Sequence, residues 1–122
     1  MTKANQLSFH TFQKINKLRN NEAYITVDSS DLFFGTAIAG EVGELCNFIK
    51  KERRDKTDFS QEIAEECADI IAYISVFAEK RGIDLGQAVT DKFNEVSRRK
   101  EVNSRFLLSE DGASIIVRDL ED

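Results

Sequence analysis

The chain has 122 residues, of which 41% are apolar and 32% charged, with a formal net charge of −5 and a pI near 5.0. This length fits one domain whose small core an oligomer would help to complete. The acidic balance argues against sequence-independent binding of a nucleic acid polymer, which needs a basic stripe that releases counterions.

Apolar residues recur at helical spacing through the first hundred residues, with no proline to interrupt them. The first predicted helix covers residues 7–21, with Phe9, Phe12, Ile15 and Leu18 as its apolar face. Residues 22–30 are predicted to form a loop whose serines can cap the next helix.

Three more helices follow in the sequence. The second is predicted over residues 31–53, and the third over residues 60–81, where Gly82 supplies a stop. Asp84 can cap a fourth, which extends to about residue 100 on an apolar stripe. Short links favour antiparallel neighbours. The predicted fold is all-α: an antiparallel four-helix bundle over residues 1–103.

Residues 104–122 form a tail rather than a separate domain. Two short runs of β-prone residues, 105–108 and 114–117, flank Glu110, Asp111 and Gly112. This pattern predicts a β-hairpin.

The longest apolar run, residues 70–77, is interrupted by Ser75 and is far short of a membrane span. We therefore expect a cytoplasmic protein without a membrane partner. Cys46 and Cys67 are far apart and lie in apolar-periodic segments, so reduced core thiols are expected rather than a disulfide or a zinc site.

Acidic residues fall on the apolar sides of the second and third helices. At about 100° per residue, with Ile38 at zero, Glu41 lies at about 300° inside the apolar arc, and Glu44 lies at its edge. With Ile70 at zero, Glu66 lies inside the arc of the third helix and Asp69 borders it. Two helices therefore each direct an acidic pair, spaced three apart, towards the core.

Carboxylates gathered in this way repel one another unless a proton or a cation compensates. At an effective dielectric of about 20, two like charges about 4 Å apart repel by about 4 kcal/mol. Donors that are all carboxylate oxygens suit a hard ion, Mg²⁺ or its substitute Mn²⁺, better than zinc or copper. Glu62 lies on the same stripe and is an outer-shell candidate, whereas the sole histidine, His10, is expected at the surface or partly buried.

Small residues form a second pattern on the second helix. Thr36, Gly40, Gly43 and Asn47 share one face at spacings of four, three and four. Each helical glycine costs about 1 kcal/mol, so we expect another helix to approach closely there.

The segment Gly-Glu-Val-Gly-Glu-Leu at residues 40–45, followed by Glu-Cys-Ala-Asp-Ile-Ile at residues 66–71, resembles the Glu-x-x-Glu and Glu-x-x-Asp signature of the MazG-like all-α nucleotide pyrophosphohydrolases. The resemblance covers about residues 34–99. It implies a four-helix core that forms homodimers or homotetramers. It also implies hydrolysis of a (deoxy)nucleoside triphosphate between the α and β phosphates, which gives a monophosphate and pyrophosphate.

The resemblance also implies roles for individual residues. Glu41, Glu44, Glu66 and Asp69 would hold Mg²⁺, and Glu41 is the expected catalytic proton acceptor. Lys92 resembles a phosphate-contacting lysine of the family. Four residues after this lysine many members have Asn or Arg, whereas this chain has Val96. The alternative candidates for contacting phosphate are therefore Asn94, Arg98 and Arg99. The candidate base-binding aromatics are Phe9, Phe12, Phe33 and Phe34, although aromatic residues at helical spacing more often belong simply to the core.

Two other functions are compatible with the sequence. One is a non-catalytic helical oligomer that binds metal or nucleotide for regulation, which Val96 favours. The other is a helical interaction module whose acidic residues pair with Lys50, Lys51, Arg53 or Arg54. This last alternative accounts poorly for Glu41 and Glu66 in apolar arcs. The leading hypothesis is a Mg²⁺-dependent hydrolase, with a role in removing unwanted nucleotides.

Overall fold

The computed structural model describes residues 7–23, 30–108 and 114–117. Its elements are α1 (Phe9–Ala23), α2 (Asp31–Asp55), α3 (Ser60–Lys80), α4 (Leu85–Arg99), β1 (Arg105–Leu108) and β2 (Ser114–Val117). The predicted all-α class, the four helices and the short hairpin are therefore confirmed. The chain divides into two compact units, Met1–Ile83 and Asp84–Asp122.

The helices begin and end where the sequence supplies local signals. The Ser30 hydroxyl accepts a hydrogen bond from the Phe33 N–H at 3.1 Å, and the Asp84 carboxylate accepts one from the Gln87 N–H at 3.1 Å. Both caps satisfy a backbone donor that the first turn leaves free. Gly82 has φ +69°, a left-handed conformation that glycine adopts without steric cost. These contacts confirm the predicted caps of α2 and α4 and the predicted stop of α3.

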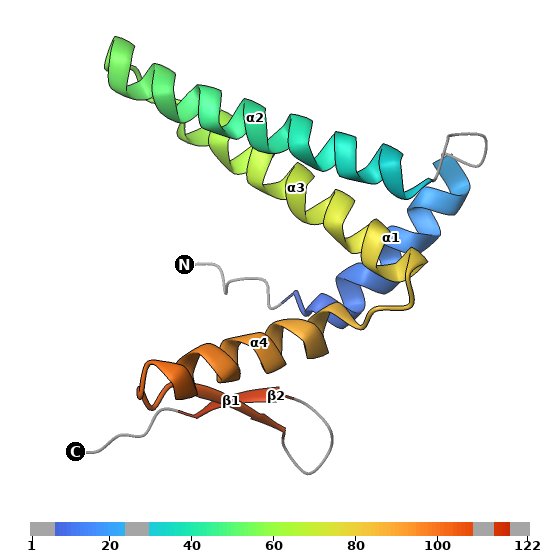
Figure 1. Cartoon of the computed structure of the whole chain (residues 1–122). Coiled ribbons are helices and arrows are strands. Elements are labelled where there is room, and N and C mark those ends of the chain that lie inside the picture. The colour runs from blue at the N-terminus through green and yellow to red at the C-terminus, as the bar shows by residue number, and fades with distance from the viewer. Residues whose placement is uncertain (1–6, 24–29, 109–113, 118–122) are drawn as a thin grey trace, which may run out of the picture. The chain divides into compact units, whose positions relative to one another are not determined.

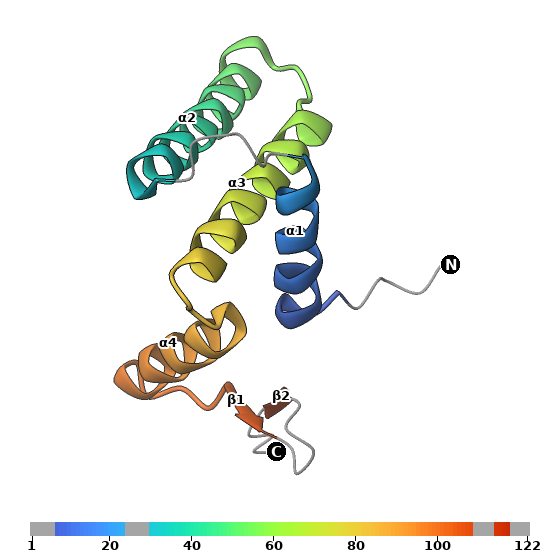
Figure 2. The same cartoon turned by 90° about the vertical axis from the view of Figure 1, so that its right-hand side faces the viewer.

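In the first unit, α2 and α3 form a long hairpin, and α1 lies across the C-terminal half of α3 (Figures 1 and 2). Phe34 is the large apolar side chain of α2 that is fully buried, and its ring lies 6.4 Å from that of Phe77 on α3. At the other end of the hairpin, the rings of Phe48 and Phe59 are 5.5 Å apart. Aromatic contacts therefore connect α2 to α3 at one end of the hairpin and to the residue that precedes α3 at the other.

The packing of α1 differs from the prediction, because α1 buries polar residues rather than its apolar stripe. Asn16 and Gln13 are buried, and they donate hydrogen bonds to the carbonyls of Ala72 (2.9 Å) and Ile83 (2.7 Å). Ile15 and Leu18 are 56% and 52% exposed. The predicted orientation of α1 is wrong because amide side chains that reach backbone carbonyls on α3 and in the segment just after it fix the contact instead.

Two further predictions about the first unit are wrong. Cys46 and Cys67 are free thiols, as expected, but both are exposed rather than in the core. A Cβ added at Gly40 or Gly43 would meet no atom within 4 Å, so no described helix approaches the glycine face of α2 closely.

In the second unit, α4 packs on β1 of the β-hairpin that β1 and β2 form. β1 and β2 are antiparallel, with Phe106 opposite Ile116. The Asn94 side chain donates to the Phe106 carbonyl (2.7 Å) and accepts from the Phe106 N–H (2.8 Å), which satisfies both backbone groups of that residue. The rings of Phe93 and Phe106 meet edge to face at 4.7 Å. A two-stranded ribbon needs such a support, and α4 supplies it.

By length and composition alone, α2 could cross a membrane, with a mean hydropathy of 1.3 over its most apolar window. This is weak evidence, since the core helices of soluble proteins pass the same test. Glu41 and Glu44 lie in the middle of α2, where a charged side chain in lipid costs about 2.5–3.5 kcal/mol.

Candidate metal centre

Three of the four predicted ligands converge between α2 and α3. Carboxylate oxygens of Glu41, Glu66 and Asp69 all lie within 4.8 Å of one another. Glu41 and Glu66 are half-buried and Asp69 is exposed, so the cluster opens to solvent on one side. The helical spacing produces this arrangement, because Glu66 and Asp69 are one turn apart on α3 and Glu41 faces them from α2.

Glu66 lies at the centre of the cluster. Its Oε2 atom is buried and has no hydrogen-bond partner. The pKa of Glu66 rises to about 7, first because its carboxyl shares a hydrogen bond with Glu41, then through burial, and then through repulsion by Glu44 and Glu41. An acceptor oxygen that is buried without a donor is the kind of group that a cation satisfies.

Glu44 and Glu62 lie outside the three-residue cluster. Glu44 is exposed, yet it is close enough to Glu66 to contribute to the raised pKa. Glu62 is half-buried one turn before Glu66 on α3. Among the described residues, none of the four predicted ligands forms an ion pair with a lysine or arginine, so the cross-helix pairs required by the interaction-module alternative are absent from this part of the chain.

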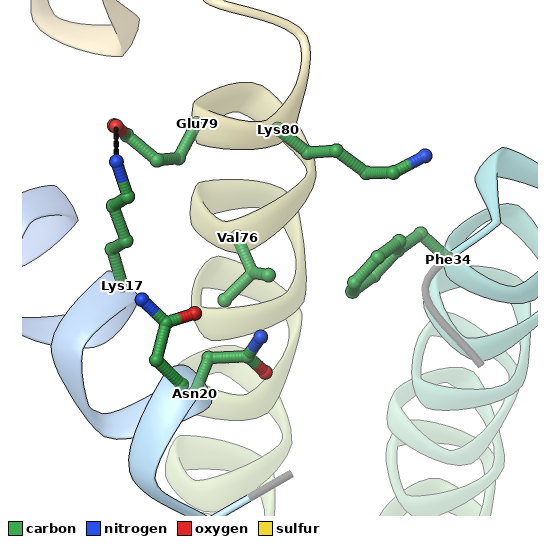
Figure 3. Close-up of a pocket in the computed structure, with 7 residues that line it drawn as sticks. Lys17, Asn20, Phe34, Val76, Glu79 and Lys80 are labelled. Carbon is green, nitrogen blue, oxygen red and sulfur yellow. Dashed lines mark ion pairs between the residues drawn. The ribbon is translucent and has the colours of Figure 1, made fainter. Parts of the chain in front are cut away.

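A pocket of about 350 Å³ lies in the same unit, where α1, α2 and α3 meet. Figure 3 shows the Phe34 ring directed towards Val76, with the Lys17–Glu79 ion pair (3.3 Å) at the far side. The complete lining is Lys17, Asn20, Asn21, Phe34, Val76, Glu79 and Lys80. Phe34 precedes Glu41 by seven residues, about 10 Å along α2, so the pocket lies within the length of a nucleoside triphosphate from the acidic cluster.

A comparison with protein-family models identifies residues 32–102, more than half of the chain, as a MazG nucleotide pyrophosphohydrolase domain. The chain belongs to this family. Comparisons with curated proteins and with solved structures found no match to the chain. The matched range contains both acidic pairs and all of α4, so the MazG domain draws on residues of both compact units.

The candidate phosphate ligands of this MazG chain lie on α4. Lys92 and Arg99 are exposed and share Glu95, at 3.3 Å and 3.9 Å. Pairs this exposed contribute little to stability and can exchange for another anion. Asn94 is different: both ends of its amide are bonded to the Phe106 backbone, so its clearest role is to hold β1. Arg98, the remaining alternative candidate for contacting phosphate, is also exposed.

The four candidate base-binding aromatics differ in their position relative to the pocket. Phe34 lines the pocket, and the Phe33 ring packs on it edge to face at 5.3 Å. Phe9 and Phe12 on α1 are not part of the pocket lining. Asn20 and Asn21 were not predicted as site residues, although Asn16 and Asn20 share the inner face of α1 at a spacing of four. That polar spacing was the available signal.

Proposed function

We propose that this MazG domain hydrolyses a (deoxy)nucleoside triphosphate between the α and β phosphates, with Mg²⁺ as its metal and Mn²⁺ as a substitute. The observation that supports the proposal best is the convergence of Glu41, Glu66 and Asp69 within 4.8 Å around a buried, unpaired oxygen of Glu66. An all-carboxylate donor set fits a hard divalent ion and gives no reason for zinc or copper.

In this proposal Glu41, Glu66 and Asp69 hold the metal, and Glu44 completes the set from the rim. When bound, the metal supplies positive charge that offsets the phosphates and favours ionisation of water. Glu41 is half-buried, and one of its carboxylate oxygens lies within 4.8 Å of a Glu66 oxygen. A carboxylate in that position can accept a proton from the attacking water, and Glu41 is therefore the proposed general base.

The pocket beside Phe34 is the proposed site for the nucleoside. A base can lie against the Phe34 and Val76 side chains, while the amides of Asn20 and Asn21 offer both donors and acceptors to its edge. Lys92 and Arg99 are the proposed phosphate contacts on α4, since neither is committed to a buried partner. A cytoplasmic location and self-association, with no membrane or nucleic acid polymer as partner, belong to the same proposal.

The test is a panel of nucleoside and deoxynucleoside triphosphates incubated with Mg²⁺ and assayed for pyrophosphate and monophosphate. Glu41→Gln and Asp69→Asn should abolish turnover while circular dichroism stays unchanged. Glu65→Gln is the matched control, because Glu65 is an exposed carboxylate on α3 next to Glu66 and outside the cluster. Turnover that survives both cluster substitutions would refute the site, and orthophosphate as the product would refute the reaction.

The same panel distinguishes a hydrolase from the non-catalytic alternative. A regulatory binder would bind Mg²⁺ and nucleotide with the same dependence on Glu41 and Asp69 but release no pyrophosphate with any nucleotide. Asn20→Ala tests the nucleoside pocket separately. We expect it to raise KM unequally for the different bases and to leave kcat little changed, because a contact made equally in ground and transition states affects binding alone.

A further inference from the structure

The pocket between α1, α2 and α3 contains an ion pair that the proposed reaction does not use. Lys17 of α1 and Glu79 of α3 meet at 3.3 Å on the pocket wall (Figure 3). Their side chains are 56% and 32% exposed, and a pair of this exposure contributes little to stability. The pair is therefore of more interest for what it offers a ligand than for what it adds to the fold.

Glu79 is the acidic side chain of the lining in the part of the chain that the structure describes. Asp31, at the start of α2, is outside the lining and accepts hydrogen bonds from Lys80 and Arg81 at 2.9 Å each. The ion pair with Lys17 uses Oε1 of Glu79, and Oε2 has no donor among the described residues. The pocket therefore presents a carboxylate oxygen that can only accept a hydrogen bond.

The neighbours of Glu79 define where a flat ring would lie. Val76 is one turn before Glu79 on α3, and residues three apart have Cβ atoms about 5–6 Å apart on the same side of a helix. The Phe34 ring is directed towards Val76 from α2, and Figure 3 shows Glu79 above Val76 and Asn20 below it. A base that lies against Phe34 and Val76 would therefore present one side of its edge to the Glu79 carboxylate.

The bases differ in what they offer to a carboxylate. Cytosine, adenine and guanine have an exocyclic amino group that donates hydrogen bonds, and carboxylates accept from the cytosine N4 amino group in protein–DNA contacts. Uracil and thymine have a carbonyl oxygen in its place, which would face the carboxylate as a second acceptor. A site built to bond a polar group of the substrate rejects an analogue that lacks this group, because the polar group of the site is then left without its partner.

We propose that Glu79 determines the base specificity of this pocket, and that it selects nucleotides whose base has an exocyclic amino group over those of uracil and thymine. The inference rests on the proposed function for the position of the nucleoside, but not on hydrolysis. Lys17 is a positioning residue, since its ammonium group holds Oε1 and leaves Oε2 for the base. Lys80, the other cation of the lining, is bonded to Asp31 and extends away from Glu79 (Figure 3).

The first experiment measures nucleoside binding to the full chain by NMR, without metal or phosphate. Cytidine and uridine form one matched pair and adenosine and inosine another, because within each pair an amino group is replaced by a carbonyl oxygen. The amino nucleoside should bind about tenfold more tightly, with shifts at the Asn20 and Asn21 side-chain amides. Equal Kd values within both pairs, or no shift at the pocket with any nucleoside, would overturn the proposal.

Substitutions of the ion pair assign the selection to Glu79. Glu79→Gln keeps the shape of the side chain, but its amide can donate to a carbonyl as well as accept, so the cytidine preference should fall to about twofold or less. Glu65→Gln changes an exposed carboxylate of α3 outside the lining and should keep the preference of the parent chain. A preference that survives Glu79→Gln unchanged would refute the role of Glu79.

The positioning role of Lys17 has its own test. Lys17→Met should also reduce the cytidine preference, whereas Lys14→Met, at an exposed position of α1 outside the lining, should not. Combined with Glu79→Gln, Lys17→Met should have no further effect, because it acts through the carboxylate. An equal effect in both backgrounds would show that Lys17 acts on the base independently and would refute the positioning role.

Hydrolysis of CTP and UTP with Mg²⁺ separates this inference from the proposed function. The kcat/KM for CTP should exceed that for UTP by about tenfold, and Glu79→Gln should reduce the difference. Equal kcat/KM values would refute selection by Glu79 and leave the hydrolase proposal in place. No turnover of either nucleotide, with cytidine still bound more tightly than uridine, would refute the hydrolase and support the specificity of the pocket.

Discussion

Replacing Asn16 with alanine tests the inverted packing of α1. Asn16 is 4% exposed, and its amide donates to the Ala72 carbonyl at 2.9 Å while accepting from Arg19 at 3.3 Å. A typical intramolecular hydrogen bond contributes about 0.5–1.5 kcal/mol, and a buried group left without its partner costs about 1–3 kcal/mol. We expect Asn16→Ala to lower the free energy of unfolding by about 1–3 kcal/mol.

Thermal and urea unfolding followed by circular dichroism measure this effect. At this chain length each kcal/mol lowers Tm by about 3–6 °C, so the expected fall is easily resolved. Leu18→Lys is the matched comparison, because Leu18 is 52% exposed and lysine is a good helix former. It should change stability by no more than about 0.5 kcal/mol. If Leu18→Lys were the more destabilising of the two, α1 would dock through its apolar stripe, and the packing described above would be incorrect.

Three further predictions concern other parts of the chain. In metal-free buffer, Glu66 should stabilise the fold below its unfolded pKa of 4.5 and lose this contribution as pH rises through about 7, because its folded pKa is raised. Urea melts between pH 4.5 and 8 should therefore show a decline that Glu66→Gln lacks, and equal slopes would contradict the assignment. Asn94→Ala should release β1 from α4 at a cost of about 1–3 kcal/mol, seen as faster amide exchange at Phe106, whereas unchanged exchange would mean that the amide does not hold the strand. Ser30→Ala should destabilise α2 by about 1 kcal/mol through loss of its N-cap, and an unchanged Tm would argue against the cap.

The positions of the helices could be read from the sequence because their causes are local. A serine or aspartate at a helix start and a glycine at a left-handed position act on the backbone within a few residues. Ser30, Asp84 and Gly82 accordingly mark the ends of α2, α4 and α3, as expected. The two strands of the hairpin also fall on the predicted residues.

The acidic site was predictable for a related reason. Spacing of three within α2 and within α3 fixes which carboxylates share a helix face, and an acid inside an apolar arc has to face the neighbouring helix. Glu41, Glu66 and Asp69 meet accordingly. The sequence did not separate these three from Glu44, because the depth of each side chain depends on how the two helices are rotated against each other.

The sequence by itself determined the helices, their ends, the family motif and the pairing of acidic residues, since each follows from interactions between residues close in the chain. Only the tertiary structure decided that α1 buries Asn16 and Gln13 while Ile15 and Leu18 face outward, and that both cysteines are exposed. It likewise decided that the Asn94 amide holds β1 rather than remaining free. The physical reason is that hydrophobic periodicity identifies an apolar face but not its partner. The hydrogen bond from a buried amide to a carbonyl of another helix can decide which face of a helix is buried. The two large apolar side chains on the other face then remain exposed.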